Sequence, residues 1–362
     1  MPRAASPRRP LSLVCALVVA LLAVALATAA GPAAAAPQDG PPWRLLDTGT
    51  TNHFRGLAVV DRNDAWLGGY RGQVLRTTDG GATWTDVSPT GPGVKQLQFR
   101  DIAASDRNHA VAMAAGSGTD SRLYVTADGG ASWRLAYKNA EPSAFFDCMS
   151  FSDAAHGLVL SDPVGGRFRV LATADGGVSW TVVPAAGVPP AQPGEAGFAA
   201  SGQCLTTVGS DAWFGSGGGA TARVYHSGDG GRTWSVTTTP LVSDPTGGVF
   251  GLAFRTASRG IVVGGDFARP AGHARVAATQ LVGGAWTLSS AMPHGYRSGV
   301  TFVPGTVGTV LAVGLTGSDV STDSGKTWSL LDTGQFDTVT CAPDGSCWAA
   351  GDVGRVAVLQ RL

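Results

Sequence analysis

The sequence predicts an all-β fold, a seven-bladed β-propeller in which consecutive blades of strands close into a ring. Three observations predict it. An eight-residue motif recurs along the chain with its tryptophans 42 to 54 residues apart, a repeat length typical of propellers and solenoids. Glycine is abundant, with 52 residues, and only 14% of residues are charged, which suits many short strands joined by tight turns. A segment near the start of the chain also nearly repeats one near its end.

The first 36 residues have the layout of a secretory signal peptide. A basic start is followed by an apolar run from Leu11 to Ala30 and by small residues up to Ala36, the features that precede cleavage. An uncleaved anchor is the alternative, because about 20 apolar residues suffice to span a bilayer. We therefore expect a secreted or extracytoplasmic protein (periplasm or cell envelope), with a short linker at 37–42 and no membrane span after cleavage.

The charge of the remaining chain argues against nucleic acid as a partner. Without the signal segment, 23 Lys and Arg face 26 Asp and Glu, a net charge of −3. Nucleic-acid binding needs a basic surface that opposes the phosphates. The sequence therefore does not predict that class of function.

The repeated motif reads Thr/Ser-x-Asp-Gly/Ser-Gly-x-Ser/Thr-Trp. Apolar residues alternate on both sides of it, so we expect a hairpin turn between two strands. The carboxylate accepts hydrogen bonds from backbone N–H groups, the glycines supply positive φ, and the tryptophan packs under the turn or against the next blade. We expect a structural role rather than a catalytic one. The five copies contribute Asp79, Asp128, Asp175, Asp229 and Asp323 with Trp84, Trp133, Trp180, Trp234 and Trp328, and a degenerate copy lies at 281–286.

The motif resembles the Asp-box (BNR-type) repeat of sialidases, of xyloglucan-active and sortilin-type propellers, and of the photosystem II stability/assembly factor family. This resemblance implies the propeller fold and no particular activity. Leu160–Gly166, Val263–Phe267 and Tyr296–Ser298 further resemble a bacterial and plant branch of assembly-factor-like proteins, some of which are named oxidoreductases. The residues do not indicate redox chemistry, because no helix follows the glycine run at 217–219 as a dinucleotide site requires. We expect no cofactor.

Seven apolar stretches, each predicting the first strand of a blade, give the number of blades. No motif follows the seventh stretch, but Trp43–Gly49 nearly repeats Trp328–Gly334. The N-terminal strand should therefore complete the last blade and close the ring, which removes open strand edges. Residues 43–362 then form one domain. The seven stretches begin at Phe54, Phe99, Phe146, Gly197, Val249, Tyr296 and Phe336.

Four cysteines follow the signal segment. Cys341 and Cys347 bracket the turn sequence Ala-Pro-Asp-Gly-Ser, which favours a small local disulfide in an exported protein. For Cys148 and Cys204 the sequence leaves both the thiol and the disulfide open. No Cys-x-x-Cys occurs and the six histidines are scattered, so we expect no zinc or other metal site.

The innermost strands of a propeller line its central channel, so polar residues on them mark a candidate site at the channel mouth. Charged residues occupy the second position of several predicted first strands, and buried charges must be paired, solvated or functional. One hypothesis is a solvated channel with internal ion pairs, and the other is a mouth that binds an anion or a sugar. The candidate residues are Arg55, Arg100, Asp101, Asp147, Asp162, Asp266, Tyr296, Arg297 and Asp319, and Asp337 shares the same strand position.

These observations favour an exported, non-catalytic platform for protein binding or assembly. The resemblance to assembly factors implies that another protein or an envelope complex is bound on one face of the ring, through loops and a charged mouth. A glycan is the alternative ligand, and we expect a monomer. A structural protein of the cell envelope is a further alternative.

A glycoside hydrolase acting on an extracellular glycan is the enzymatic alternative. A sialidase-like mechanism needs an arginine cluster, a tyrosine nucleophile and a glutamate. The chain has only two glutamates, Glu141 and Glu195, and both lie in predicted loops. A pair of aspartates such as Asp101 and Asp147 would need no glutamate, so the sequence leaves the question of catalysis open while favouring a non-catalytic role.

Overall fold

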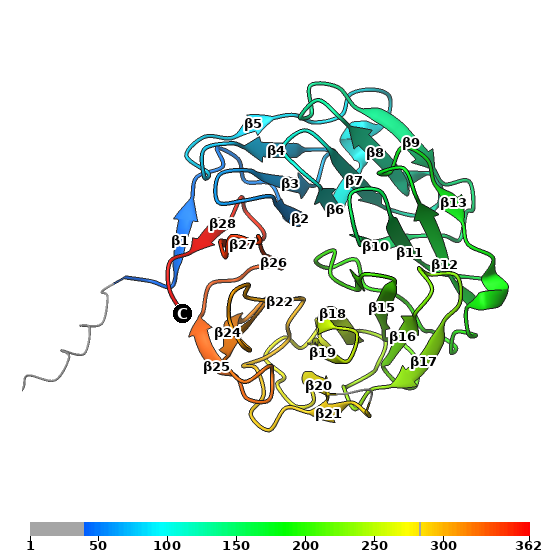
Figure 1. Ribbon diagram of the computed structural model, residues 1–362, viewed down its shortest axis with the longest axis vertical. Helices are drawn as coiled ribbons and strands as arrows, with labels where there is room; N and C mark the ends of the chain where they lie inside the picture. Colours follow the sequence, from blue (N-terminus) through cyan, green and yellow to red (C-terminus); the bar gives the residue numbers. More distant parts are fainter. Residues whose placement is uncertain (1–39, 282–283) are drawn as a thin grey trace, which may run out of the picture. The chain divides into compact units, whose positions relative to one another are not determined.

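The computed structural model describes residues 40–281 and 284–362. The predicted signal peptide, the first half of the predicted linker and part of the degenerate motif copy lie outside the described residues. Pro41–Leu362 form one compact unit, in which seven four-stranded sheets are arranged as blades around a ring (Figure 1). The prediction of an all-β, seven-bladed propeller is confirmed.

Six blades use four consecutive strands, and the seventh takes its outer strand from the N-terminal end of the described chain. Blades 1 to 3 comprise β2 (Phe54–Val59), β3 (Ala65–Gly69), β4 (Val74–Thr77), β5 (Thr85–Asp86), β6 (Gln98–Ala104), β7 (Ala110–Ala115), β8 (Arg122–Thr126), β9 (Arg134–Lys138), β10 (Phe146–Phe151), β11 (Gly157–Val164), β12 (Arg167–Thr173) and β13 (Thr181–Val182). Blades 4 to 6 comprise β14 (Leu205–Val208), β15 (Asp211–Ser216), β16 (Arg223–Ser227), β17 (Ser235–Thr238), β18 (Gly247–Thr256), β19 (Arg259–Asp266), β20 (Ala277–Leu281), β21 (Thr287–Leu288), β22 (Gly299–Phe302), β23 (Val310–Gly314), β24 (Gly317–Ser321) and β25 (Ser329–Asp332). Blade 7 comprises β26 (Thr338–Cys341), β27 (Cys347–Ala350), β28 (Val356–Leu359) and β1 (Trp43–Leu46).

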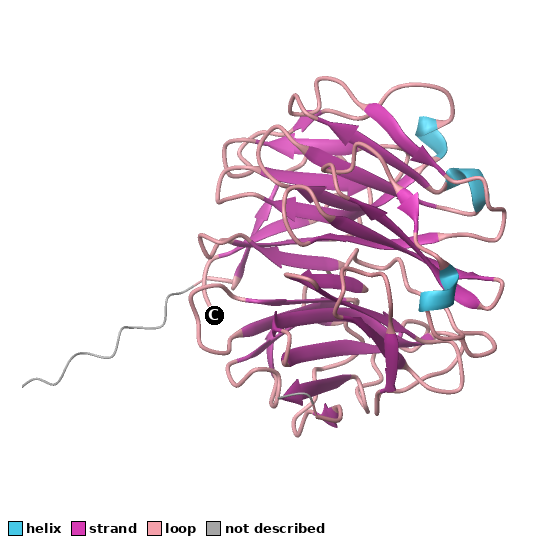
Figure 2. Cartoon of the chain, turned by 45° about the vertical axis from the view of Figure 1, so that its right-hand side comes forward, coloured by secondary structure: helices cyan, strands magenta, loops and turns pink. Residues whose placement is uncertain are grey.

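Helical structure in the described residues is limited to three short 3₁₀ turns, at Val94–Gln96, Gly118–Asp120 and Ala185–Gly187 (Figure 2). Within 40–281 and 284–362, no helix has the length and apolar character needed to cross a membrane.

Each repeated motif closes a hairpin through hydrogen bonds within its own turn. In the first copy the hydroxyl of Thr77 donates to Asp79 Oδ1 (2.8 Å) and accepts from the N–H of Gly81 (2.9 Å). The N–H of Thr83 donates to Asp79 Oδ1 (2.9 Å) and its hydroxyl donates to Oδ2 (2.6 Å). The hydroxyl of Thr83 is the main cause that lowers the pKa of Asp79 to about 2. Equivalent bonds recur in the other four copies, so each carboxylate is occupied inside its turn.

The hydrophobic core is divided into seven clusters, each of which lies between two neighbouring blades. Between blades 1 and 2, the cluster holds fully buried Trp66 from β3 and Phe99 from β6. Trp133, from the second motif copy, stands edge-on to Trp66 with ring centroids 6.2 Å apart. The tryptophan of the motif therefore helps to pack one blade against the next.

The N-terminal strand closes the ring as the near-repeat predicts. β1 pairs antiparallel with β28 in the register that places Trp43 opposite Leu359 and Leu46 opposite Val356. Trp43 is 2% exposed, and its indole N–H donates to the hydroxyl of Ser318 in blade 6 (2.9 Å). Closure therefore combines strand pairing within blade 7 with side-chain packing on the preceding blade.

The first strand of blade 4 is where the structure departs from the prediction. The sequence predicts a strand from Gly197, whereas β14 begins at Leu205. Residues 197–203 instead form a loop, which we name the plug, that extends toward the centre of the ring (Figure 1). The side-chain amide of Gln203 donates across the ring to the carbonyls of Val300 in blade 6 (3.1 Å) and Val339 in blade 7 (2.8 Å). The chain itself therefore occupies the central channel at this level.

Small residues and a disulfide hold the plug in place. Gly202 has a φ of +74°, and a Cβ there would lie 2.5 Å from Asp101 Oδ1 in blade 2. A strand cannot accommodate this left-handed backbone, and no side chain would fit the contact. Cys204, directly after the plug, is joined by a disulfide to Cys148 in β10. The second disulfide joins Cys341 and Cys347 across the β26–β27 hairpin, as the sequence favours.

Candidate functional site

β-bulges direct side chains from the innermost strands toward the channel. The register between first and second strands shifts at Arg55 in β2, at Arg100 in β6, at Asp147 in β10 and at Phe250 in β18. A bulge leaves one residue unpaired and turns its side chain out of the alternating pattern of the strand. Each of these positions follows an aromatic or branched residue, and three of the four hold a charged side chain.

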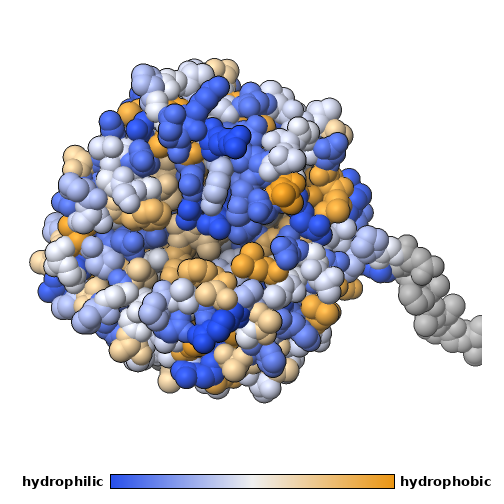
Figure 3. Space-filling model, turned by 180° about the vertical axis from the view of Figure 1, so that it is seen from behind, coloured by the Kyte–Doolittle hydropathy of each residue, from blue (hydrophilic) through white to orange (hydrophobic). Residues whose placement is uncertain are grey.

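A cavity of about 220 Å³, which we name the mouth pocket, brings several of these residues together. Two arginines and one aspartate share it with aromatic rings, and the plug supplies part of the wall. Figure 3 views the ring from behind and shows hydrophilic residues along one side of a central hollow, with apolar residues around much of the rest. The lining consists of Arg55, Arg100, Phe198, Ala199, Ala200, Phe250, Phe267, Tyr296, Leu315 and Asp337.

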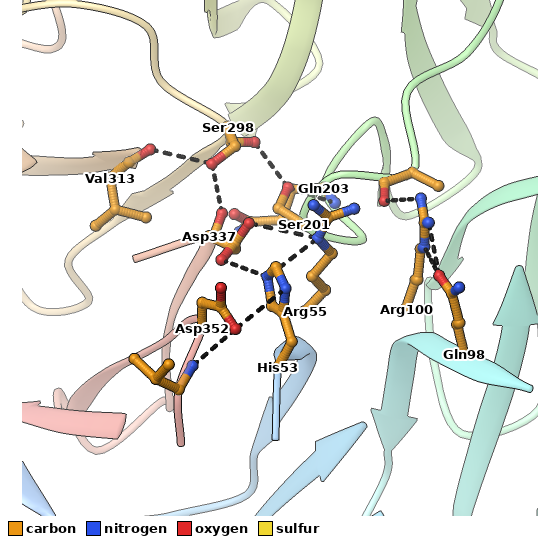
Figure 4. A network of polar contacts seen from close by, with 12 residues as sticks. His53, Arg55, Gln98, Arg100, Ser201, Gln203, Ser298, Val313, Asp337 and Asp352 are labelled. Carbon is orange, nitrogen blue, oxygen red and sulfur yellow. Dashed lines mark hydrogen bonds and ion pairs between the residues drawn. The ribbon is translucent and has the colours of Figure 1, made fainter. Parts of the chain in front are cut away.

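Arg55 already has a counter-charge. Its Nε lies 3.4 Å from Asp337 Oδ1, and Asp337 Oδ2 lies 2.9 Å from His53 Nε2 (Figure 4). His53 in turn stacks on the ring of Tyr70, with centroids 4.9 Å apart. This network fixes Arg55 at the edge of the mouth pocket and neutralises much of its charge locally.

Arg100 has no such counter-charge. Its guanidinium donates to Gln98 Oε1 from Nε (3.0 Å) and to the plug carbonyl of Ala199 (3.3 Å), and no carboxylate in the described part of the chain forms an ion pair with it. The guanidinium also lies 5.7 Å from the centroid of the Tyr70 ring. Burial, followed by repulsion from Arg55, lowers the pKa of Arg100. A half-buried cation without a paired anion is costly, so this arginine is the strongest anion-binding group in the pocket.

Asp147, on the next blade, is a buried acid that is harder to ionise than an exposed aspartate. Asp147 is 1% exposed, and its Oδ2 has no hydrogen-bond partner among the described residues. Burial, then the charge of Asp162, raise the pKa of Asp147 well above its usual value, against the opposing effect of Arg100. Burial also raises the pKa of Asp162 to about 6. The raised pKa of Asp147 makes it a weaker counter-charge for Arg100 than an exposed aspartate would be.

Tyr296 lies in the mouth pocket as a packing residue. It is 3% exposed, and its ring stands edge-on to Phe250 at 4.8 Å. Burial, then the charge of Asp337, raise the pKa of its phenol. A phenol that is harder to ionise is a poorer nucleophile, which does not suit the role a sialidase-like mechanism would require.

Arg297 and Asp319 lie outside the mouth pocket. Both are 0% exposed, and Arg297 Nε donates to Asp319 Oδ2 (2.7 Å). A second Arg297 nitrogen bonds the Tyr296 carbonyl and the Thr316 hydroxyl (2.8 and 2.7 Å). The expectation that these two residues belong to the channel mouth is thus replaced by a buried ion pair inside blade 6. Arg297 misses the mouth because it precedes β22, whose paired residues begin at Gly299.

Three further aspartates are also engaged elsewhere. Asp101 accepts from the backbone N–H groups of Ile102 (2.8 Å) and Met149 (2.7 Å), which ties blade 2 to blade 3. Burial raises its pKa to about 8. Asp266 accepts from Thr246 (2.7 Å) and pairs with Arg269 near the surface. Asp162 accepts from the N–H of Gly197 in the plug (2.9 Å). None of the three lines the mouth pocket.

Sequence reasoning misses several residues of the mouth pocket and its surroundings. His53 and Tyr70 lie in connections next to β2 and β3. Phe267 lies outside the predicted inner strands, and Phe198 lies in the stretch from Gly197 that is predicted as a strand but forms the plug. Only Asp337 carries a signal, because it occupies the strand position that Arg55 and Arg100 share. Across the part of the chain that the structure describes, no three His, Cys, Asp or Glu side chains are grouped as a metal site would need.

No protein family model matches this sequence, and no curated protein matches it. Solved structures do. A structure of YCF48 bound to D1 peptide is 16% identical with a TM-score of 0.62, and the match covers 90% of this chain and 98% of that chain. YCF48 from Cyanidioschyzon merolae is 14% identical with a TM-score of 0.62, covering 88% of this chain and 98% of that chain. The RRP9 WD40 repeats are 11% identical with a TM-score of 0.62, covering 88% and 97%.

These likenesses show the fold. At such identities the matched chains share the ring of seven blades, while the residues of a site are free to differ. The function must therefore be argued from the mouth pocket itself.

Proposed function

We propose that this chain is a protein-binding platform whose mouth pocket holds a carboxylate of an extended partner segment. The observation that carries the proposal is Arg100, a half-buried cation without a carboxylate partner in the described chain. A carboxylate bound there would gain a charge-assisted hydrogen bond and relieve the unpaired charge. The aromatic rings of Phe198, Phe250 and Phe267 favour an apolar group beside that carboxylate.

The size of the pocket supports a segment rather than a folded surface. About 220 Å³ accommodates one side chain or one chain end, and the plug blocks passage through the ring. YCF48, which has the same fold, has been observed with D1 peptide bound. A peptide ligand is therefore compatible with a ring of this kind.

The arrangement of acids favours this proposal over a glycoside hydrolase. Such an enzyme needs two carboxyl groups that face the same bound sugar. Asp101, Asp147, Asp162 and Asp266 do not line the mouth pocket. Glu195 is buried in an ion pair with Arg223. We therefore infer binding rather than hydrolysis.

We further propose that the platform is exported and acts outside the cytoplasm as a monomer. The layout of residues 1–36 supports a cleaved signal peptide. Two disulfides support an oxidising compartment, because reduced thiols prevail in the cytosol. We also propose that the five repeated turns are Asp boxes, on the strength of their shared residues and bonds.

Peptide titration tests the proposal. Calorimetry with N-acetyl-Ala-Ala-Gly-Phe as the free acid, the same peptide as its amide, and N-acetyl-Ala-Asp-Phe amide separates a chain-end carboxylate from a side-chain carboxylate. We expect one of the two carboxylate peptides to bind, and the variant Arg100→Met to weaken it about 10- to 100-fold, the effect of losing one hydrogen bond to a charged group.

The matched control is Arg44→Met, which removes an exposed arginine of β1 and should leave the affinity unchanged. Equal binding of the acid and the two amides, or full binding by Arg100→Met, would refute the carboxylate site.

A further inference from the structure

Two buried acids of blade 3, Asp147 and Asp162, are connected to Arg100 of blade 2 through the plug. Asp147 lies in the β-bulge of β10, and Asp162 lies in β11 next to Ser161, the residue that pairs with Phe146. Asp162 Oδ1 accepts the N–H of Gly197 at the start of the plug (2.9 Å). Two residues later, the carbonyl of Ala199 accepts from Arg100 (3.3 Å). The plug thus links the acid pair and the anion-binding arginine by two hydrogen bonds.

The plug backbone packs closely against the two acids, so their charge acts directly on the plug. A Cβ on Gly197 would lie 2.6 Å from Asp147 Oδ2, so the plug backbone lies directly against this carboxyl group. Asp147 is almost fully buried, and its Oδ2 has no partner among the described residues. Asp162 accepts the N–H of the same Gly197, and two carboxyl groups against one buried residue cannot both ionise cheaply. The pair therefore holds at least one proton under conditions in which exposed aspartates hold none.

We propose that the Asp147–Asp162 pair regulates the mouth pocket by its proton count, so that the pocket binds a carboxylate more tightly when both acids are protonated than after Asp162 has ionised. This inference rests on the proposed function, because it concerns the affinity of the same pocket. When Asp162 ionises, a negative charge appears behind Arg100 and opposes the incoming anion. The Gly197 N–H also becomes a donor to a charged acceptor, which holds the plug and its Arg100 contact more firmly.

The sign of the pH dependence follows. The pKa of Asp162 is raised to about 6, so this acid loses its proton between roughly pH 5 and 7. Anion affinity should therefore fall as pH rises through this range, by about tenfold, the effect of one unit charge a few side chains away from a half-buried site. Burial, then the charge of Asp162, raise the pKa of Asp147 as well, so the first proton to leave the pair is assigned to Asp162.

Other charged groups face the same space and must be separated from the pair. Asp337 is paired with Arg55. Asp101 lies against Gly202 of the plug, and burial raises its pKa to about 8, above the step assigned to Asp162. His53 Nε2 lies 2.9 Å from Asp337 Oδ2. The His53→Gln variant removes this imidazole and is therefore an essential control.

The test uses benzenesulfonate as the probe, because this anion carries its charge at every pH used, and measures its affinity for the full mature chain from pH 5.5 to 8. We expect the wild type and His53→Gln to lose about tenfold in affinity with rising pH, and Asp162→Asn to bind with the tighter, acidic affinity at every pH. A reciprocal measurement follows the side-chain ¹³C resonance of Asp162. Saturation with the probe should shift its titration midpoint upward by about one pH unit, because linkage requires equal coupling in both directions.

The outcomes separate the two proposals. If the wild type binds the probe, Arg100→Met does not, and the affinity is independent of pH, then the regulation is wrong and the binding site stands. A slope that persists in Asp162→Asn but vanishes in His53→Gln also overturns the regulation. If the wild type binds neither the probe nor either carboxylate peptide, both proposals fail.

Discussion

Replacement of Arg297 by methionine should destabilise the ring while leaving the mouth pocket intact. Methionine keeps much of the length and apolar character of the arginine stem but removes its charge. The change leaves Asp319 buried at 0% exposure with only the contacts of His294, whose N–H donates to Asp319 Oδ2 (3.1 Å) and whose Nδ1 lies 2.7 Å from Oδ1. It also leaves the Tyr296 carbonyl without the arginine donor.

The expected loss in the free energy of unfolding is about 3–5 kcal/mol, the usual cost of removing one partner from a buried ion pair. Removing both charges at once, in Arg297→Met/Asp319→Leu, should cost less than the single change, because no uncompensated charge remains buried. Arg44→Met, on the exposed outer strand β1, should change stability by less than about 0.5 kcal/mol.

Urea unfolding followed by circular dichroism measures these differences, and peptide titration of the folded variant measures the pocket. A loss below about 1 kcal/mol for Arg297→Met, or a double variant less stable than the single one, would refute the reasoning that Arg297 is a structural cation. Loss of peptide binding in a fully folded Arg297→Met would return this residue to the binding site.

Three further predictions concern closure, the plug and acidity. Trp43→Ala, which empties a 2% exposed site in the closing strand, should lower the free energy of unfolding by about 3–5 kcal/mol in urea melts, with Leu45→Ala at an exposed position of β1 as control. The double variant Cys148→Ser/Cys204→Ser removes a cross-link between residues 56 apart and should lower the free energy of unfolding by about 4 kcal/mol. Hydrogen exchange should become faster in the plug than in the blades. Asp162 has its pKa raised to about 6, so the wild type should lose about 2–3 kcal/mol of stability relative to Asp162→Asn between roughly pH 4 and 6, measured by urea melts at each pH. A constant difference between the two proteins over that range would contradict the last of these.

The ring could be predicted from the sequence because its determinants are local and repeated. Each motif copy contains its own turn donors and acceptors, as the bonds of Thr77 and Thr83 to Asp79 show. Closure of the ring could also be predicted, because Trp43–Gly49 nearly repeats Trp328–Gly334. The near-repeat indicates that the N-terminal strand takes the outer position in the last blade. Repetition supplies several independent observations of one feature, so a copy that departs from the pattern, such as the one at 281–286, does not obscure it.

The mouth pocket was only partly predictable. Arg55 and Arg100 share a strand position with Asp147 and Asp337, and the structure shows that three of these four positions are β-bulges. The sequence also predicts Arg297 in this set, but one residue of register separates a channel-facing side chain from one buried in the blade. Pairing register depends on contacts between distant strands, which spacing does not report.

The plug explains why the channel hypothesis had to change. In the other blades with an extended inner strand, an aromatic or branched residue precedes the bulge and anchors the strand. In blade 4 the corresponding stretch, Gly197–Gln203, is rich in glycine and alanine, and its polar groups find partners on other blades rather than in a sheet. The bonds of Gln203 to Val300 and Val339 join residues 97 and 136 positions apart, which no local pattern encodes. Because this segment fills the axis, the arginines meet a pocket rather than an open channel. This is the basis on which we propose a carboxylate ligand, because a solvated channel would screen the charge of Arg100 more strongly than a pocket lined with aromatic rings does.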